Sequence, residues 1–509
     1  MRTRYKSGVD RGQPALLPPR LDDLVGADNR VRAIDAYVEA LDLGRLGFVM
    51  PGSSGGRGQP PYAPGDLLKL YLYGYLHRTR SSRLLAREAR VNVEAMWLVR
   101  GLCPGYRTIG DFRAANAAAL KAANRDFVLL CRDLGLFGGT LAAIDGSFFR
   151  GDASKASIVT KTRLEAALAA LDRDIAGYIG GLDAADAGDG DGDGEEMAGD
   201  ADGAGKIATA MARRAALAAD LAALEASGQT QLSRTDPDAR LLSKNGASVA
   251  GYNVQCAVDD RHNLIAASAV TGDGNDAGQL AAMAQAAREA TGTQTVVADA
   301  GYWNGEELKA CEDAGIEAFV PAPDKSGRLE REGRFGVDAF VWDGARDVHV
   351  CPAGADLVAS SALKRNGGKL YRRFASRAET CARCPLRTRC LKPGARRREV
   401  LRWEHADTLD RHRVRMAGAE AKAIVRRRGA IVEHPFGTLK CRAGWRHFLV
   451  RGRAKVEGEW SLMALAYNFS RAVTILGPGG FASALAARLR ACLAVFLRPV
   501  CEGARAQPA

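Results

Sequence analysis

The apolar positions in the first part of the chain recur at the spacing of an α-helix. The run LLKLYLYGYLHR follows the helix-initiating string PGD, and the run RLLAREARVNVEAMWLV follows two serines, so both runs predict helices. Residues 1–138 are therefore predicted to form an all-helical N-terminal domain. The polar string HRTRSS between the runs fits the turn of a helix-turn-helix, and it fits a plain helical bundle equally well. In a helix-turn-helix, the arginines near this turn would contact DNA: Arg78, Arg80 and Arg83.

After residue 138 the pattern changes to that of β-strands. The short apolar run LAAIDGSFF is bounded by glycines, and the string AGYNVQCAVD alternates before a turn and a second run, LIAASAV. A helical segment, the strand TQTVVAD, a helix around GEELKACEDAG and a strand at IEAFVP follow. Strands mixed with helices predict an α/β core with a mixed sheet, whose first part spans residues 139–320.

Residues 161–228 interrupt this core with a second helical pattern. Apolar residues recur at spacings of three and four on both sides of the acidic, glycine-rich string DAADAGDGDGDGEEMAGDAD. This spacing predicts an antiparallel helical hairpin, and the composition of the string predicts a disordered linker. The predicted contact residues are Leu164, Leu168, Leu171, Ile175 and Tyr178 on one helix, and Ile207, Met211, Leu217, Leu221 and Leu224 on the other.

A second insertion, at residues 321–404, contains four cysteines. Cys381, Cys384 and Cys390 stand in the string CARCPLRTRC, and Cys351 lies upstream of them. One CxxC pair with two further thiolates suits a tetrahedral structural Zn²⁺. Reduced cysteines without a metal also fit this pattern, so both interpretations remain open.

The remaining chain is predicted to complete the core at residues 405–475 and to end in a helix and tail at residues 476–509. The apolar string FASALAARLRACLAVFL carries Arg488 and Arg490, which predicts an amphipathic packing helix. No stretch of about 20 apolar residues is present, and the first residues lack the apolar core of a signal peptide. We therefore expect no membrane association and no export.

Composition adds a class of partner to this picture. The 509 residues carry a formal net charge of +13, and the pI is about 9.3. Such a chain suits a polyanion, because phosphates that pair with Arg and Lys release condensed counterions. The strings RTRCLKPGARRREVLR and RHRVRMAGAEAKAIVRRR would form either a solvated surface or a DNA track. The string GxxxxGK[ST] of nucleotide-binding loops is absent, so no nucleotide hydrolysis is expected.

Three acidic residues stand at the ends of predicted elements. Asp145 closes the first strand, Asp299 closes the strand TQTVVAD, and Glu433 opens the helical string IVEHPFGTLK. Small residues follow both aspartates and leave room for metal, water and phosphate. Acids at such places also occur for structural reasons, because they cap turns or interact favourably with the dipole at the start of a helix. Other acids compete for the third position: Glu457, Glu459, Asp236 and Asp238.

The strings around these acids are similar to the three signature segments of bacterial insertion-sequence DDE transposases, and YRTIGDFRAAN resembles the end of their N-terminal domain. The resemblance implies an RNase H-like catalytic core behind an all-α domain that binds transposon ends. Acids on the first strand, the fourth strand and a late helix would converge at one edge of that sheet. Asp145, Asp299 and Glu433 would hold two Mg²⁺ or Mn²⁺ ions for phosphodiester chemistry.

The resemblance also implies an activity and partners. The protein would cleave double-stranded DNA at transposon ends and join the freed 3′-hydroxyl to target DNA, as a homodimer on DNA in the bacterial cytoplasm. Two other functions fit the same residues. One is an inactive DNA-binding regulator derived from a transposase, and the other is a metal-dependent nuclease without strand transfer.

This chain departs from the family pattern upstream of Glu433. The family's tyrosine and arginine are replaced by Arg426 and Gly429, so the role of the arginine would fall to Arg428 or a neighbour. Lys440 would lie two helical turns after Glu433 and meet a DNA phosphate.

Trp303 follows the second aspartate closely. It would stack on an unpaired base at a transposon end or pack, with Tyr302, beneath the site.

Overall fold

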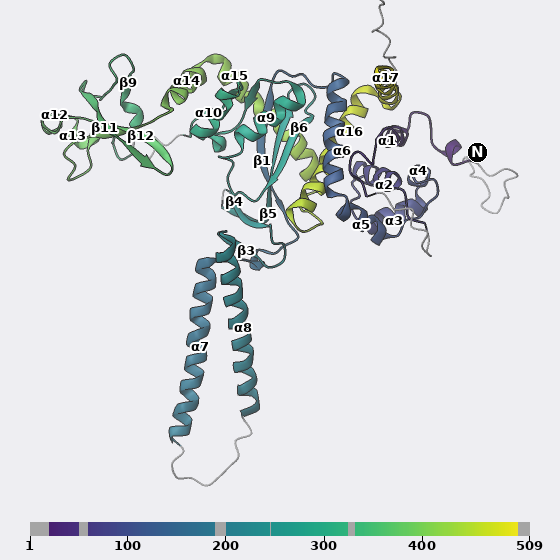
Figure 1. Ribbon diagram of the computed structural model, residues 1–509, viewed down its shortest axis with the longest axis horizontal. Helices are drawn as coiled ribbons and strands as arrows, with labels where there is room; N and C mark the ends of the chain where they lie inside the picture. Colours follow the sequence, from purple (N-terminus) through teal and green to yellow (C-terminus); the bar gives the residue numbers. More distant parts are fainter. Residues whose placement is uncertain (1–19, 50–59, 189–199, 245, 324–330, 497–509) are drawn as a thin grey trace, which may run out of the picture. The chain divides into compact units, whose positions relative to one another are not determined.

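The computed structural model describes residues 20–49, 60–188, 200–244, 246–323 and 331–496 (Figure 1). The chain divides into two compact units. The first comprises Met1–Leu136, Phe148–Tyr252 and Gly437–Ala509, and the second comprises Phe137–Ser147 and Asn253–Phe436. Strands β1 (Ala142–Arg150) and β5 (Ala247–Asp259) each run from one unit into the other. The domain boundaries predicted from the sequence stay predictions.

Helices build the N-terminal part of the first unit, which confirms the predicted helical region. Asn29 caps the first of them by accepting a hydrogen bond from Val31 N at 3.0 Å. Pro64 opens the next at a position where no backbone donor is needed. The helices are α1 (Arg30–Glu39), α2 (Pro64–Leu76), α3 (Ser82–Val91), α4 (Val93–Leu98), α5 (Tyr106–Ala115) and α6 (Ala117–Asp133), after the 3₁₀ turn η1 (Leu21–Leu24).

Two helices at the end of the chain belong to the same unit. Helix α16 (Arg453–Leu476) packs against α6 and α2, and α17 (Pro478–Phe496) packs against α1 through a face that buries Phe481 and Leu485. Among the described residues, no single helix has the length and hydropathy of a membrane span. Helices α16 and α17 pass that test only as a pair, with a bend of 102° between them.

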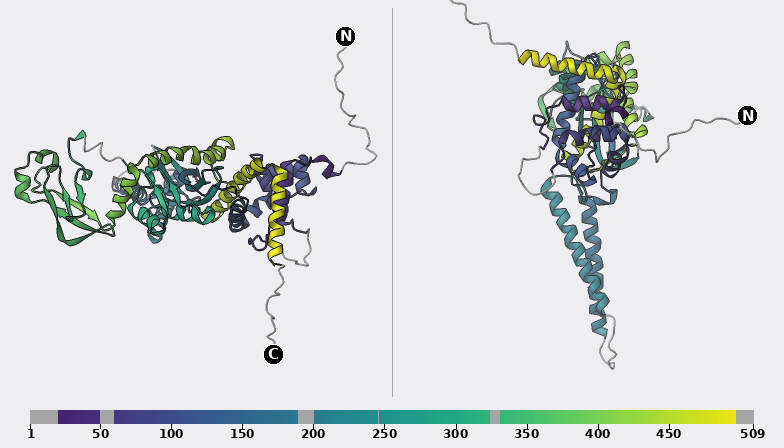
Figure 2. Two further views of the ribbon diagram at one scale, coloured as in Figure 1. Left: turned by 90° about the horizontal axis from the view of Figure 1, so that it is seen from above. Right: turned by 90° about the vertical axis from the view of Figure 1, so that its right-hand side faces the viewer.

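The predicted hairpin is formed by α7 (Lys161–Gly188) and α8 (Asp200–Ser227), as Figure 2 shows. The ion pair Lys161–Glu225 joins the start of α7 to the end of α8, and Asp172–Arg214 joins positions nearer the middle of both helices. The two helices are therefore antiparallel. At the base, after the 3₁₀ turn η2 (Lys155–Ser157), β2 (Ile158–Thr160) pairs antiparallel with β3 (Gln231–Ser233).

Burial along this hairpin is uneven. Leu164, Leu217 and Leu224 form a buried cluster with Val159 of β2, whereas the predicted contact residues Tyr178 and Met211 are exposed. The acidic linker predicted between the helices falls on residues 189–199, which lie outside the described residues.

A mixed sheet of six strands contains β1 and β5, and the α/β class is confirmed. The hydrogen-bonded order is β4-β5-β1-β7-β8, and β6 also pairs with β5. Strand β7 is parallel to β1 and β8, whereas β5 is antiparallel to β4 and β6. The remaining bounds are β4 (Arg240–Lys244), β6 (Ile265–Thr271), β7 (Thr295–Val297) and β8 (Glu317–Phe319).

Four helices of the second unit accompany this sheet. Gly292, with φ at +82°, ends the first helix in the left-handed conformation that favours glycine, and Asn304 caps the second. Leu280, Ile144 and Val296 contribute to the buried core between helices and strands. The helices are α9 (Leu280–Thr291), α10 (Gly305–Asp313), α14 (Ala406–Ala417) and α15 (Ala419–Phe436), and the 3₁₀ turn η3 (Ala300–Tyr302) follows β7.

The cysteine-containing insertion forms a separate antiparallel sheet with its own small core. Phe340, Leu357, Phe374 and Val400 are buried together in it. The strand order is β13-β12-β11-β10-β9. The bounds are β9 (Val341–Asp343), β10 (Val348–Val350), β11 (Asp356–Asn366), β12 (Lys369–Ala375) and β13 (Glu399–Trp403), with η4 (Val337–Ala339), α12 (Ala378–Ala382) and α13 (Arg387–Cys390).

Candidate active site

Asp145 lies within β1, and Asp299 lies two residues after the end of the neighbouring strand β7, at the same level. Strands β1 and β7 run parallel, with Ala142 opposite Val296 and Ala143 opposite Val297. Each acid comes two residues after the last of these pairs, and neighbouring strands are about 4.8 Å apart. Both carboxylates therefore come from one edge of the sheet, where β1 and β7 bring them close together.

Backbone hydrogen bonds hold both carboxylates locally. Asp145 Oδ1 accepts a hydrogen bond from Gly146 N at 2.8 Å, and Asp299 Oδ1 accepts one from Gly301 N at 2.8 Å. The second bond caps the turn η3. Both side chains are half-buried, so solvent and a phosphate group can reach them.

Arg428 approaches Asp145 from helix α15. Its Nη1 lies 3.4 Å from Asp145 Oδ2, and the two side chains are 21% and 20% exposed. Helix α15 packs against β7 and β8, so this helix borders the strand that precedes Asp299. Glu433 is exposed on the same helix. Helix α15 carries Arg428 and also Glu433, which lies near the end of the helix and does not open one as predicted. Asp145 lies inside β1 and not at its end, whereas Asp299 follows the end of β7 as predicted.

Tyr302 is fully buried near the two aspartates. Burial raises its pKa well above the ordinary tyrosine value, and the negative charges of Asp276, Asp145 and Asp299 raise it further. The Tyr302 hydroxyl therefore remains protonated and acts as a hydrogen-bond donor.

Asp276 is the site residue that sequence reasoning missed. Asp276 is 6% exposed and accepts hydrogen bonds from Asn253 Nδ2 at 2.9 Å and Gln255 Nε2 at 2.7 Å. Asn253 and Gln255 are themselves fully buried on β5. Two polar residues at buried alternate positions of a strand require polar partners, and that signal was available in the string AGYNVQCAVD.

The family chemistry calls for divalent cations, and the donors fit in type. Carboxylate oxygens are the ligands that Mg²⁺ and Mn²⁺ prefer, and Asp145 and Asp299 are half-buried neighbours. In the described part of the chain, however, no three His, Cys, Asp or Glu side chains are grouped closely enough to hold one ion. The structure therefore brings the aspartates together as a pair, and the role of Glu433 as the third ligand stays a prediction.

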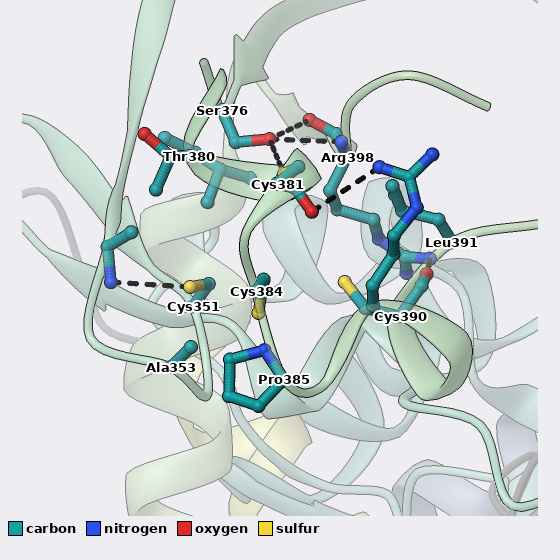
Figure 3. Close-up of a pocket in the computed structure, with 13 residues that line it drawn as sticks. Cys351, Ala353, Ser376, Thr380, Cys381, Cys384, Pro385, Cys390, Leu391 and Arg398 are labelled. Atoms are coloured by element: carbon teal, nitrogen blue, oxygen red, sulfur yellow. Dashed lines mark hydrogen bonds between the residues drawn. The ribbon is translucent and has the colours of Figure 1, made fainter. Parts of the chain in front are cut away.

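The four cysteines line one pocket of about 220 Å³ (Figure 3). Cys351 Sγ accepts a hydrogen bond from Ala355 N at 3.3 Å, and Cys381 Sγ lies 3.0 Å from Ser376 Oγ. Burial and the neighbouring thiols raise the pKa of Cys390. All four are free thiols and do not form a metal-holding group among the described residues. Zinc at this pocket stays a prediction, and so does the reduced, metal-free state.

The arginines predicted to contact DNA divide into exposed and buried ones. The two predicted helices correspond to α2 and α3. Arg78 is exposed in the turn between them, and Arg83 is exposed on α3, where it lies 5.4 Å from the centroid of the Tyr106 ring. Arg80 is only 7% exposed. Its Nη1 donates to His447 O at 2.9 Å, so Arg80 has partners within the protein and its contact with DNA stays a prediction.

Lys440 and Trp303 also have partners within the protein. Lys440 Nζ donates to Phe148 O at 2.5 Å and lies 4.2 Å from the centroid of the Phe149 ring. Lys440 belongs to the π-helix η5 (Gly437–Arg442), so the α-helical spacing that related it to Glu433 ends at Phe436. Trp303 is half-buried, contacts the core of the second unit and meets the ring of His412 edge-on at 5.3 Å.

Glu459, a competitor for the third position, is fully buried in an ion-pair network. Its Oε1 lies 3.3 Å from Arg80 Nη1 and 3.6 Å from Arg113 Nη1, and its Oε2 accepts from Leu449 N at 2.8 Å. Asp236 is buried as well, and accepts from Tyr252 Oη at 2.8 Å and from Gly452 N at 2.9 Å. Both acids therefore have structural partners within the first unit.

Comparison with known families identifies two segments of this chain. Residues 19–115 match the family described as Transposase domain (DUF772), and residues 350–473 match the family described as Transposase DDE domain. The first match contains Arg78, Arg80 and Arg83. The second contains the four cysteines, Arg428, Glu433 and Lys440, whereas Asp145 and Asp299 precede it. No curated protein matches the chain.

Proposed function

We propose that this chain, two segments of which match transposase families, is an insertion-sequence DDE transposase that cuts DNA at the ends of a mobile element and joins the freed 3′-hydroxyl to target DNA. The observation that carries this proposal is the register of β1 and β7, which brings Asp145 and Asp299 to one edge of the sheet. Paired carboxylates suit metal-assisted phosphodiester chemistry, because they can hold cations at the attacking and leaving oxygens.

We further propose that the sheet is the core of an RNase H-like fold. The order β6-β5-β1-β7-β8 contained in the sheet supports this assignment, since an antiparallel pair lies on one side of β1 and parallel strands lie on the other. Helix α15, which packs on β7 and β8, would supply Glu433 as the third acid. In this proposal Asp145, Asp299 and Glu433 hold two Mg²⁺ or Mn²⁺ ions.

The chain's own residues would have distinct roles in cleavage. Bound divalent ions would activate the attacking oxygen and stabilise the leaving oxygen. Asp145 and Asp299 would supply negative oxygens held in place by Gly146 N and Gly301 N. Arg428, which pairs with Asp145, would donate hydrogen bonds to a phosphate of the bound DNA.

DNA binding would begin with the N-terminal helices. Exposed Arg78 and Arg83 are offered as contacts to the phosphates of a transposon end, and Lys440 as a further phosphate contact. Arg80 is left out of this proposed surface because its guanidinium is buried. Two ends must be paired for transposition, so we propose a homodimer on DNA in the bacterial cytoplasm.

The decisive experiment compares the full chain with Asp145→Asn on duplexes taken from both flanks of its gene. We expect the wild-type protein to nick these duplexes in Mg²⁺ and to join the 3′ ends to a target plasmid. Asp145→Asn should bind the same duplexes and fail to cut them, because a neutral amide is a poor ligand for a hard cation. The control is Asp174→Asn, an exposed residue of α7, which should cut normally.

Each alternative function has its own result in this experiment. Full cleavage by Asp145→Asn would overturn the site assignment. Cleavage by the wild-type protein without joined products would indicate a nuclease, and binding without cleavage would indicate an inactive regulator.

A further inference from the structure

We propose that Asp276 is a positioning residue that fixes both metal-binding aspartates in one geometry. This inference rests on the proposed DNA cleavage, because it assigns a task to Asp276 within the same site. Asp276 precedes α9 in the chain, so it lies on neither of the strands that carry Asp145 and Asp299. Its side chain is nonetheless buried, and a buried carboxylate is tolerated only where hydrogen bonds compensate for lost water.

Those hydrogen bonds connect three separate segments. Asp276 Oδ1 accepts from Asn253 Nδ2 at 2.9 Å and from Gln255 Nε2 at 2.7 Å, and both donors belong to β5. The Tyr302 hydroxyl, which belongs to the turn after Asp299, donates to Gln255 Oε1. Asp276 is thereby linked through Gln255 to the turn that Asp299 caps.

The glycines beside the two aspartates bring the Asp276 carboxylate close to both. Gly146 directly follows Asp145, and a Cβ atom there would lie 2.5 Å from Asp276 Oδ1 and 3.0 Å from Asn253 Oδ1. A Cβ atom at Gly301 would lie 3.7 Å from Asp276 Oδ2. One oxygen of this carboxylate therefore occupies the space that a side chain at Gly146 would need, and the other oxygen lies near the corresponding space at Gly301.

This arrangement provides a way to hold the two aspartates at a fixed separation. The Asp145 and Asp299 side chains are half-buried, and the ladder between β1 and β7 pairs only residues before them. The contacts of Asp276 extend the restraint past the last paired residues. Substitution of groups that orient metal ligands typically costs about 10- to 100-fold in metal affinity.

The test measures Mn²⁺ binding to the full chain by titration, and DNA cleavage as a function of Mn²⁺ concentration. Asp276→Ala removes the acceptor and should weaken Mn²⁺ binding about 10- to 100-fold, with cleavage needing correspondingly more metal. Asp276→Asn keeps an amide oxygen that can accept both hydrogen bonds, so its Mn²⁺ affinity should stay close to wild type. Glu289→Ala, which removes an exposed acid of α9, is the control and should change neither measurement.

A paired exchange provides an independent variant of the same contact. Gln255→Glu places a second carboxylate against Asp276 and should weaken Mn²⁺ binding through repulsion. In the double variant Gln255→Glu/Asp276→Asn, the new amide at position 276 can donate a hydrogen bond to the new carboxylate at position 255. This variant should therefore regain the lost Mn²⁺ affinity. If Asp276→Ala does not fold, as judged by thermal unfolding, Asp276→Asn and this exchange decide the question.

Two results would overturn the inference. Unchanged Mn²⁺ affinity in a folded Asp276→Ala protein would remove the positioning role. Equal losses in Asp276→Asn and Asp276→Ala would show that the charge itself is needed, as for a direct metal ligand. Failure of the wild-type protein to cleave DNA would instead reject the proposed function, and Mn²⁺ binding would still decide the role of Asp276.

Discussion

Glu459 is a fully buried acid of the first unit that is paired with two buried arginines. Two guanidinium groups face its carboxylate, and those side chains are 7% and 8% exposed. The cost of burying these charges is offset by their mutual attraction and by the hydrogen bond from Leu449 N. Arg80 also lies 5.6 Å from the centroid of the Trp445 ring, so the network joins the turn after α2 to the segment before α16.

Removing the Glu459 carboxylate should destabilise the protein strongly. Glu459→Ala leaves two buried arginines without a counter-charge, and we expect the free energy of unfolding to fall by about 3 to 5 kcal/mol. Urea unfolding followed by tryptophan fluorescence would measure this loss. Glu457→Ala is the control on the same helix: its partners Lys121 and Arg453 are 61% and 59% exposed, so it should cost at most about 1 kcal/mol. Equal losses in the two variants would contradict this account.

At the scale of elements, the helical hairpin is stabilised mainly at its base. Leu164, Leu217 and Leu224 are buried there beside β2 and β3, while Tyr178 and Met211 expose 36% and 54% of their surface. Helix propensity alone barely stabilises a helix in water, so helices in proteins depend mainly on tertiary packing of this kind. The distal part of α7 and α8 therefore relies on fewer tertiary contacts than the base does.

Two substitutions on α8 should separate these regions. Leu224→Ala removes a side chain that is 1% exposed and should lower the free energy of unfolding of the hairpin by about 2 to 5 kcal/mol. Met211→Ala removes an exposed side chain and should change it by less than about 0.5 kcal/mol. Hydrogen exchange of the α7 and α8 amides would report both effects, and equal protection in the two variants would refute the difference in packing.

For the whole molecule, the charge of +13 makes salt a direct probe of DNA binding. Each phosphate contact contributes about 0.9 to the slope of log affinity against log salt. Arg83→Gln should therefore weaken binding to end duplexes and reduce that slope by about one. Arg173→Gln, which removes the same charge from an exposed position on α7, should leave the slope unchanged. A loss of slope in both variants would mean that net charge, and not the surface near α3, controls binding.

Short stretches of sequence were sufficient to predict many of the helices and strands. Alternation in AGYNVQCAVD predicted the strand that became β5, and helical spacing predicted α2, α3, α7 and α8. These predictions succeed because the spacing of apolar side chains in a strand or helix can be recognised within a short stretch of sequence. The same spacing overestimated the contact surface of the hairpin: Tyr178 and Met211 occur at the right intervals, but they are exposed.

The sequence by itself predicted the resemblance to transposases, many of the helices and strands, and the two aspartates that follow apolar runs, because short strings carry each of these signals. Only the tertiary structure decided what meets these aspartates. Asp276, Asn253, Gln255 and Tyr302 come from separate segments, and their hydrogen bonds depend on strand register and burial. Arg80 and Arg83 look alike in the string HRTRSSR, yet one is buried against Glu459 and the other is exposed. A side chain's neighbours across a fold depend on packing between distant segments, which no local pattern records.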